Sequence, residues 1–278
     1  QYINYKANYY TLSYTRRFVL KNGLGNRVRE KRIGFWVAVT SGFLLFSFFI
    51  APFTVDAGTI PKLSGRANSL DYMTENSTFS WGNQQTHDHG KIGHNQEEHG
   101  FFSWSELNIY AATIYAFGDI NCHQKHERSW VINENQMPVC TRDVGIFAGA
   151  FLMGIVWHRY GHNRWTIKDS FLSIFSDDML NSTYENNRRN LLFWGFGTLA
   201  VIPILFDGGF QAISSGYESG TIRRIITGTL FGLGFIWFFC ASLSAKPSRF
   251  ENESQVLLPA NARFVQPSEE FHQDTSEE

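Results

Sequence analysis

Long apolar runs constrain the fold of this chain more than any other feature of its sequence. There are four of them, and each has roughly 17 residues or more, the length at which an α-helix crosses the hydrocarbon core of a bilayer. They lie at 34–55, 144–160, 190–206 and about 222–244, and strongly polar stretches separate them. The pattern predicts an all-α fold, a polytopic membrane bundle with four transmembrane helices.

A fifth run, 101–118, is apolar on one face only, because Glu106 and Asn108 interrupt it. We expect it to lie in the membrane interface or against the bundle. With four spans, 16 of the 24 Lys and Arg residues fall on the inner side and 8 on the outer side, whereas a fifth span gives 13 and 11. Basic residues concentrate on the cytoplasmic side of membrane proteins, so we expect a cell-membrane protein with both termini in the cytoplasm.

Changes in composition divide the chain into five segments. They are a basic cytoplasmic N-terminal segment (1–33), the first transmembrane helix (34–55), a polar His-rich outer loop (56–100), a core with three transmembrane helices (101–244) and an acidic polar tail (245–278). The tail has too few apolar residues to order itself by burial. We expect the outer loop to be solvated. Its imidazoles are a weaker candidate for a divalent metal site, formed by His87, His89, His94 and His99.

Two of the three cysteines, Cys122 and Cys140, lie in one polar stretch that this topology places outside. We expect them to be close in space and joined by a disulfide, unless a metal holds them as thiolates. A metal site would use Cys122, His123 or His126, and Cys140, a donor set that suits zinc or copper. If the stretch is helical, Cys122 and His126 share one face. A thiol enzyme that reduces a quinone is a further alternative, although the stretch has no Cys-x-x-Cys motif.

Other polar residues converge on the same outer side. An arginine near the lipid boundary needs a partner or water, so we expect at least one contact between an arginine of 119–143 and a carboxylate of 207–218. The predicted polar cluster consists of Gln124, Arg128, Ser129, Arg142, Asp143, Asp207, Gln211, Glu218 and Arg223.

Four signatures in this region resemble a prokaryotic membrane-protein family known as domain of unknown function 2085. They are Cys122-His123-Gln124 with Arg128-Ser129; Pro138, Cys140, Arg142 and Asp143 before a Gly-rich helix; Pro203, Asp207, Gly208 and Gln211; and Glu218-Ser219 with Arg223 or Arg224 before Thr227-Gly228. The resemblance covers roughly 101–243. It implies a small helical membrane bundle, and it brings no activity, cofactor or substrate.

The sequence lacks the motifs of the common soluble chemistries, namely a nucleotide-binding glycine loop, a nucleophile elbow and HExxH. Its net charge of -1 gives no sign of nucleic-acid binding. The first functional hypothesis is a structural or accessory subunit of a larger membrane complex, in contact with lipids and other subunits, with a stapled polar cap on its outer face. The alternative is a metal-binding or thiol/quinone redox protein. The sequence assigns no catalytic residue.

Overall fold

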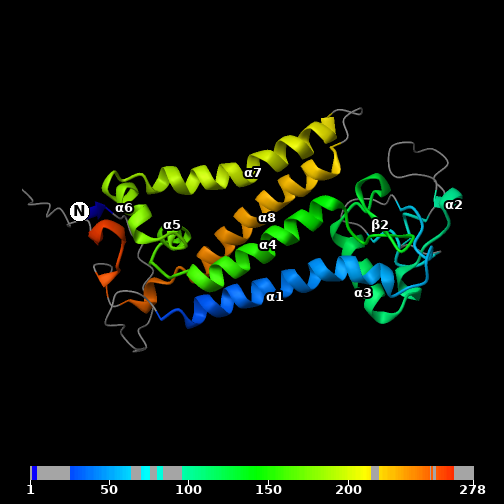
Figure 1. The fold of residues 1–278 in the computed structure, drawn as a ribbon, viewed down its shortest axis with the longest axis horizontal. Helices are drawn as coiled ribbons and strands as arrows, with labels where there is room; N and C mark the ends of the chain where they lie inside the picture. Colours follow the sequence, from blue (N-terminus) through cyan, green and yellow to red (C-terminus); the bar gives the residue numbers. More distant parts are fainter. Residues whose placement is uncertain are drawn as a thin grey trace, which may run out of the picture. The chain divides into compact units, whose positions relative to one another are not determined.

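The computed structural model describes residues 2–4, 26–63, 70–75, 80–83, 96–213, 219–250, 252 and 255–265. Long helices dominate these residues (Figure 1): α1 (Val28–Ile50), α4 (Thr141–Tyr160), α7 (Arg189–Ile213) and α8 (Thr221–Ser244). The chain divides into two compact units. The first contains Gln1–Gly34, Val156–Phe196 and Trp237–Glu278, and the second contains Phe35–Ile155 and Gly197–Ile236.

Three helices of the described part are long and apolar enough to cross a membrane: Val28–Phe53, Arg189–Gln211 and Thr221–Ser244. The first begins before the predicted boundary at 34, so basic residues of the N-terminal segment belong to its first turns. Helix α4 does not reach the same apolarity, because charged and polar side chains flank its apolar centre at both ends. The fold is therefore helical with several candidate spans, as the sequence predicts, while the count of four is not established.

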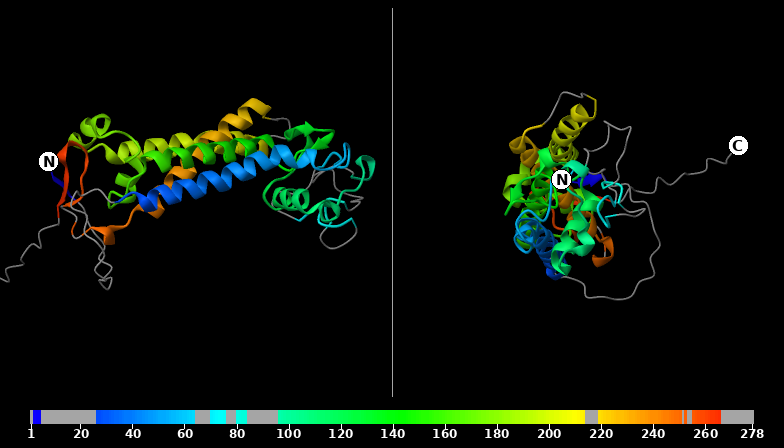
Figure 2. Two further views of the ribbon diagram at one scale, coloured as in Figure 1. Left: turned by 60° about the horizontal axis from the view of Figure 1, so that its bottom comes forward. Right: turned by 90° about the vertical axis from the view of Figure 1, so that its right-hand side faces the viewer.

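Glycines bring the helices of the second unit into close backbone contact. A Cβ atom at Gly232 of α8 would lie 2.1 Å from the carbonyl oxygen of Ile146 on α4, and one at Gly149 of α4 would lie 2.3 Å from the carbonyl oxygen of Thr229 on α8. On another side of α4, a Cβ at Gly154 would lie 2.6 Å from the backbone nitrogen of Ala38 on α1. Helix α4 thus packs on both α1 and α8, and the ribbons run side by side in Figure 1 and in the left view of Figure 2.

Between α1 and α4 the chain forms a compact substructure, which we call the cap (51–63, 70–75, 80–83 and 96–140). Its elements are η1 (Ala51–Phe53), α2 (Gln96–His99), η2 (Trp104–Glu106), α3 (Ile109–Asn121), η3 (His126–Arg128) and the antiparallel pair β2 (Val131–Ile132) and β3 (Asn135–Gln136). Helix α3 has 13 residues. At 1.5 Å per residue it measures about 20 Å, which is shorter than the hydrocarbon core of a bilayer.

Buried amide side chains hold the cap together. Asn135 accepts a hydrogen bond from the backbone nitrogen of Ile60 (2.8 Å) and donates to the carbonyl oxygens of Pro52 and Asp56 (3.0 Å each). Ile60, Leu63 and Tyr72 are almost fully buried. Some described residues of the predicted solvated loop at 56–100 are therefore buried, and tertiary hydrogen bonds satisfy polar groups that the sequence assigns to water.

The first unit contains α5 (Ile167–Leu172), α6 (Asp177–Glu185), η4 (Pro247–Arg249), η6 (Pro259–Asn261) and a parallel pair of strands, β1 (Tyr2–Asn4) and β4 (Arg263–Val265). Phe250, Val256, Leu258 and Phe264 are buried. Described residues of the tail are therefore held by burial of apolar side chains, contrary to the prediction from its low apolar content. A few apolar side chains suffice, because they pack against other parts of the chain.

Arginines of the basic N-terminal segment also cap the C-terminal ends of helices in the first unit. The guanidinium of Arg27 donates to the carbonyl oxygens of Gly161 (2.9 Å) and His158 (3.1 Å) at the end of α4. Arg29 donates to the carbonyl oxygens of Ser244 and Leu243 at the end of α8. The last carbonyls of a helix lack partners within it and carry partial negative charge, so cations stabilise this end.

Candidate metal centre

The end of α3 fixes the position of Cys122. The helix ends at Asn121, and the backbone of Cys122 is extended, with its N–H donating to the carbonyl oxygen of Gly118 (2.8 Å). At Gly118 a Cβ atom would lie 1.9 Å from the carbonyl oxygen of Pro138. Only glycine permits this approach, which brings the end of α3 against the residues that precede α4.

Side-chain hydrogen bonds close the base of the loop between the two cysteines. Gln124 Nε2 donates to the carbonyl oxygen of Pro138 (2.9 Å), and Gln136 Nε2 donates to the carbonyl oxygen of Gln124 (2.6 Å). Gln124 has a positive φ of 46°, so the chain turns sharply there. These contacts hold Cys122 and Cys140 together without a covalent bond.

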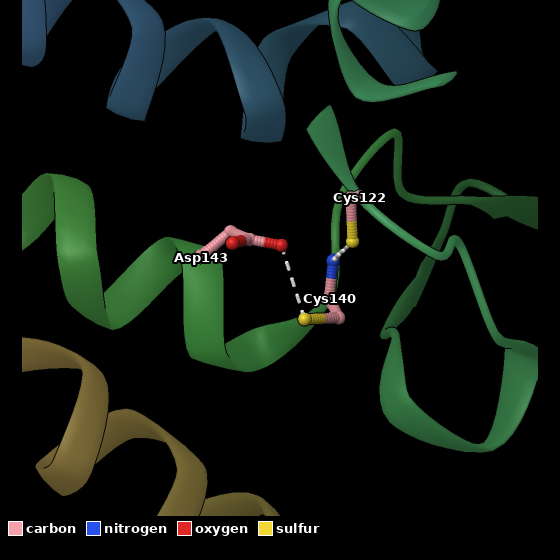
Figure 3. Close-up of side chains that lie close together, drawn as sticks. All are labelled: Cys122, Cys140 and Asp143. Carbon is pink, nitrogen blue, oxygen red and sulfur yellow. Dashed lines mark hydrogen bonds between the residues drawn. The ribbon is translucent and has the colours of Figure 1, made fainter. Parts of the chain in front are cut away.

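Cys122, Cys140 and Asp143 form a compact group of donor atoms (Figure 3). The backbone N–H of Cys140 donates to Cys122 Sγ (3.2 Å), and the Cys140 thiol donates to Asp143 Oδ2 (3.1 Å). One ligand atom from each residue lies within 4.8 Å of the others. The predicted proximity of the cysteines is confirmed. Both are free thiols in this structure, so the predicted disulfide is not present.

The environment of Cys122 favours the protonated thiol. Its pKa is well above the ordinary value, because of the hydrogen bond with the Cys140 thiol, then burial, then the negative charge of Asp143. Thiol oxidoreductases need the opposite, a cysteine whose pKa is lowered by nearby positive charge. A cation bound between these groups would neutralise their negative charge.

The donor atoms fit the dimensions of a zinc site after a small contraction. With zinc–sulfur bonds of about 2.3 Å and zinc–oxygen bonds of about 2.1 Å, tetrahedral geometry places the ligand atoms about 3.6–3.8 Å apart. The ligand atoms here are at most 4.8 Å apart, so shifts of about 1 Å bring them to that spacing. Two thiolates and a carboxylate are suitable ligands for zinc, and thiolates alone also suit copper.

The predicted histidine ligands are not in this group. Because α3 ends at Asn121, the stretch from Cys122 to His126 does not continue this helix, and the condition under which the two residues would share a face is not met. Among the described residues no group of three metal-ligating side chains includes His123, His126 or His99. Burial lowers the pKa of His123. The remaining histidines of the predicted loop site lie outside the described residues: His87, His89 and His94.

The predicted contact between an arginine and a carboxylate is confirmed. Arg142, in the first turn of α4, forms an ion pair with Asp207 of α7 and lies 3.4 Å from the side-chain oxygen of Gln211. In the reversed amide orientation, Gln211 accepts from Arg224 and from the backbone nitrogen of Ser219. Arg224 is only 1% exposed, whereas Arg223 is exposed. The cluster therefore also contains Arg224, which the sequence-based set did not include.

The other predicted members of this cluster have separate positions. Gln124 belongs to the loop base described above, and Ser129 donates to the carbonyl oxygen of Lys125 (3.3 Å). Arg128 is half-buried at the end of η3, and no contact between it and Asp207 or Gln211 is established. Glu218 lies outside the described residues.

Sequence reasoning missed the residue that anchors the far side of the cap. Asp119, near the end of α3, accepts hydrogen bonds from the backbone nitrogens of Asp71 (3.0 Å) and Tyr72 (2.9 Å) and from Trp104 Nε1 (2.9 Å). Its pKa is raised by burial, although the three donors act in the opposite direction. The sequence feature that could have identified Asp119 is its position as a single carboxylate at the end of an apolar helix.

Apolar helices of spanning length define this chain as an integral membrane protein. Residues 122–238 match the model of a family described as "Predicted membrane protein (DUF2085)", which confirms the resemblance seen in the sequence motifs. The match begins at Cys122 and includes Cys140, Asp143 and Asp207. Comparison with curated proteins and with solved structures gives no match.

Proposed function

We propose that the chain crosses the cell membrane four times and that both termini lie in the cytoplasm. In this proposal α4 spans the membrane in addition to the three candidate spans. The 20 residues of α4 give a length of about 30 Å, the thickness of the hydrocarbon core. Its contacts with α1 and α8 shield it, so it needs less apolarity than a helix that faces lipid. The segment boundaries given above, 1–33, 34–55, 56–100, 101–244 and 245–278, remain part of this proposal.

We further propose that the cap lies outside the cytoplasm and that Cys122, Cys140 and Asp143 hold a zinc ion that staples it. The observation that carries this proposal is the convergence of two thiols and a carboxylate, within 4.8 Å, at the junction of the cap and α4. Structural zinc contributes its binding free energy to folding, and here it would add to the stability that the buried apolar residues of the cap already supply. Copper is the second candidate, and the carboxylate makes it the less favoured one, since Cu(I) prefers soft ligands alone.

Metal analysis of the purified protein tests this proposal. We expect about one zinc per chain after loading with zinc and removal of excess metal, measured by inductively coupled plasma mass spectrometry. The variants Cys122→Ser and Cys140→Ser should each lose that zinc. Cys240→Ala is the matched control, because Cys240 is buried in α8 and is not part of the group. A wild-type protein that retains no metal, or a Cys122→Ser variant that retains it fully, contradicts the zinc staple.

A wider role as an accessory subunit of a membrane complex is the second proposal. It is supported by apolar side chains that the cap exposes outside the candidate spans: Ile109 is 87% exposed, Val131 53% and Phe101 46%. Apolar side chains exposed outside the spans are available for contacts with partners or lipid. A photo-crosslinking amino acid at position 109 should give a protein adduct in native membranes, while the same probe at exposed Glu127 should not. Lipid adducts alone would contradict the subunit role.

A further inference from the structure

We propose that Cys122 and Cys140 alternate between two exclusive states, a zinc-bound dithiolate and a disulfide, and that a peroxide oxidant converts the first into the second. This inference rests on the proposed zinc site and adds its regulation. Both states would staple the same loop base, one through a metal and the other through a covalent bond. The cap would therefore stay closed while its zinc is released.

The geometry allows both states because the loop base is closed independently of the sulfur atoms. The hydrogen bonds of Gln124 and Gln136 fix the backbone on either side of the cysteines. The two sulfur atoms lie within 4.8 Å of each other. Cys140 Sγ now points toward Asp143 (Figure 3), so rotation of its side chain is the movement that would bring it to Cys122 Sγ. A disulfide needs a sulfur–sulfur distance of about 2.05 Å.

The conversion balances with hydrogen peroxide as the oxidant. Each zinc-bound thiolate gives up one electron, the sulfur–sulfur bond forms, and the zinc ion leaves. The two electrons break the oxygen–oxygen bond of the peroxide, and two protons from solvent complete two water molecules. Thiolates rather than thiols are the reactive species in such oxidations, and zinc holds both sulfurs in that form.

Asp143 distinguishes the two states. Its carboxylate would be the third zinc ligand, but it takes no part in a sulfur–sulfur bond. Replacing it by asparagine keeps the size of the side chain and removes the negative charge that strengthens the bond of a carboxylate to zinc. Asp143→Asn should therefore weaken zinc binding at least about tenfold and still permit the disulfide.

The experiment treats zinc-loaded wild-type protein in detergent with hydrogen peroxide. Zinc release is followed with a chromogenic zinc chelator, and the cross-link is identified by mass spectrometry of non-reduced peptides. We expect one zinc released for each Cys122–Cys140 cross-link, reversal by dithiothreitol with added zinc, and unchanged behaviour in Cys240→Ala. Asp143→Asn should bind zinc weakly and form the same cross-link.

Two results would overturn the inference and leave the zinc site standing: zinc that stays bound while the cysteines oxidise, or zinc release with no Cys122–Cys140 cross-link. A different result would overturn the zinc site itself. If wild-type protein binds no more zinc than Asp143→Asn, and both form the disulfide equally, the cysteines are a plain disulfide pair and there is no metal state to regulate. The comparison of the two proteins therefore separates the two failures.

Discussion

The close contact between α4 and α8 predicts opposite effects for the same substitution at two glycines. Gly232 faces the backbone of α4, where a Cβ atom would lie 2.1 Å from the carbonyl oxygen of Ile146. Gly195, in α7, has nothing within 4 Å of the position that a Cβ would occupy. Gly232→Ala should therefore destabilise the protein, and Gly195→Ala should leave it unchanged or stabilise it.

The magnitude follows from the size of the overlap. An ordinary contact of a Cβ atom is 3.4 Å or more, so the helices would have to separate by more than 1 Å at Gly232. The obstructing atom belongs to the backbone, and no side-chain rotation relieves it. Overpacking of this kind costs about 1–3 kcal/mol. Alanine in place of an exposed helical glycine contributes about 0.5–1 kcal/mol of stability. We expect the two variants to differ by about 1.5–4 kcal/mol.

Unfolding in mixed micelles with increasing sodium dodecyl sulfate measures this difference. The 8 tryptophans supply the fluorescence signal. The midpoint should move to lower detergent fraction for Gly232→Ala only. Equal midpoints for the two variants would refute the reasoning, because they would mean that α4 and α8 do not approach each other as closely as their glycines allow.

Three further predictions concern the cap and the topology. Asp119→Asn should lower the free energy of unfolding by about 1–3 kcal/mol in the same assay, because one of three buried donors would face an NH₂ group; exposed Asp178→Asn is the control, and equal losses would contradict the role of Asp119. Zinc affinity should rise with pH and binding should release protons, because the pKa of the Cys122 thiol is raised and zinc must displace its proton. Calorimetry in two buffers of different ionisation enthalpy measures the number of protons released. A zinc affinity that does not change with pH would contradict this prediction. A cysteine introduced at exposed Val131 should react with an impermeant maleimide on intact cells, and one at exposed Met179 only after permeabilisation, whereas the reverse pattern would end the proposed orientation.

The sequence predicts the parts of this fold that depend on local composition. Long apolar runs identify the helices, since length and hydropathy decide whether a helix can span. The pairing of Arg142 with Asp207 is also predictable, because a charge beside apolar helices needs a partner close by. The proximity of Cys122 and Cys140 is likewise a feature that the sequence predicts.

The cap could not be predicted, because its order depends on contacts between residues far apart in the chain. Asn135 and Asp119 are polar residues of the kind that solvated loops contain. Only the fold shows that their side chains form hydrogen bonds with backbone groups about 50 to 80 residues away in the chain. The position at which α3 ends, Asn121, also determines which side chains lie near Cys122, and the sequence did not predict that position. One more turn of α3 would have placed His126 beside Cys122, as the sequence suggested.

The first turn of α4 explains why Asp143, and not a histidine, completes the candidate site. Cys140 and Asp143 are three positions apart, a spacing that places both on one side of a helix as it begins. Arg142, one position earlier than Asp143, points about 100° away, which directs it to Asp207 of α7. One helical turn thus joins the cap to the bundle through two different contacts. A ligand at the cysteines would therefore bind to the same helical turn that contacts Asp207 of α7 through Arg142.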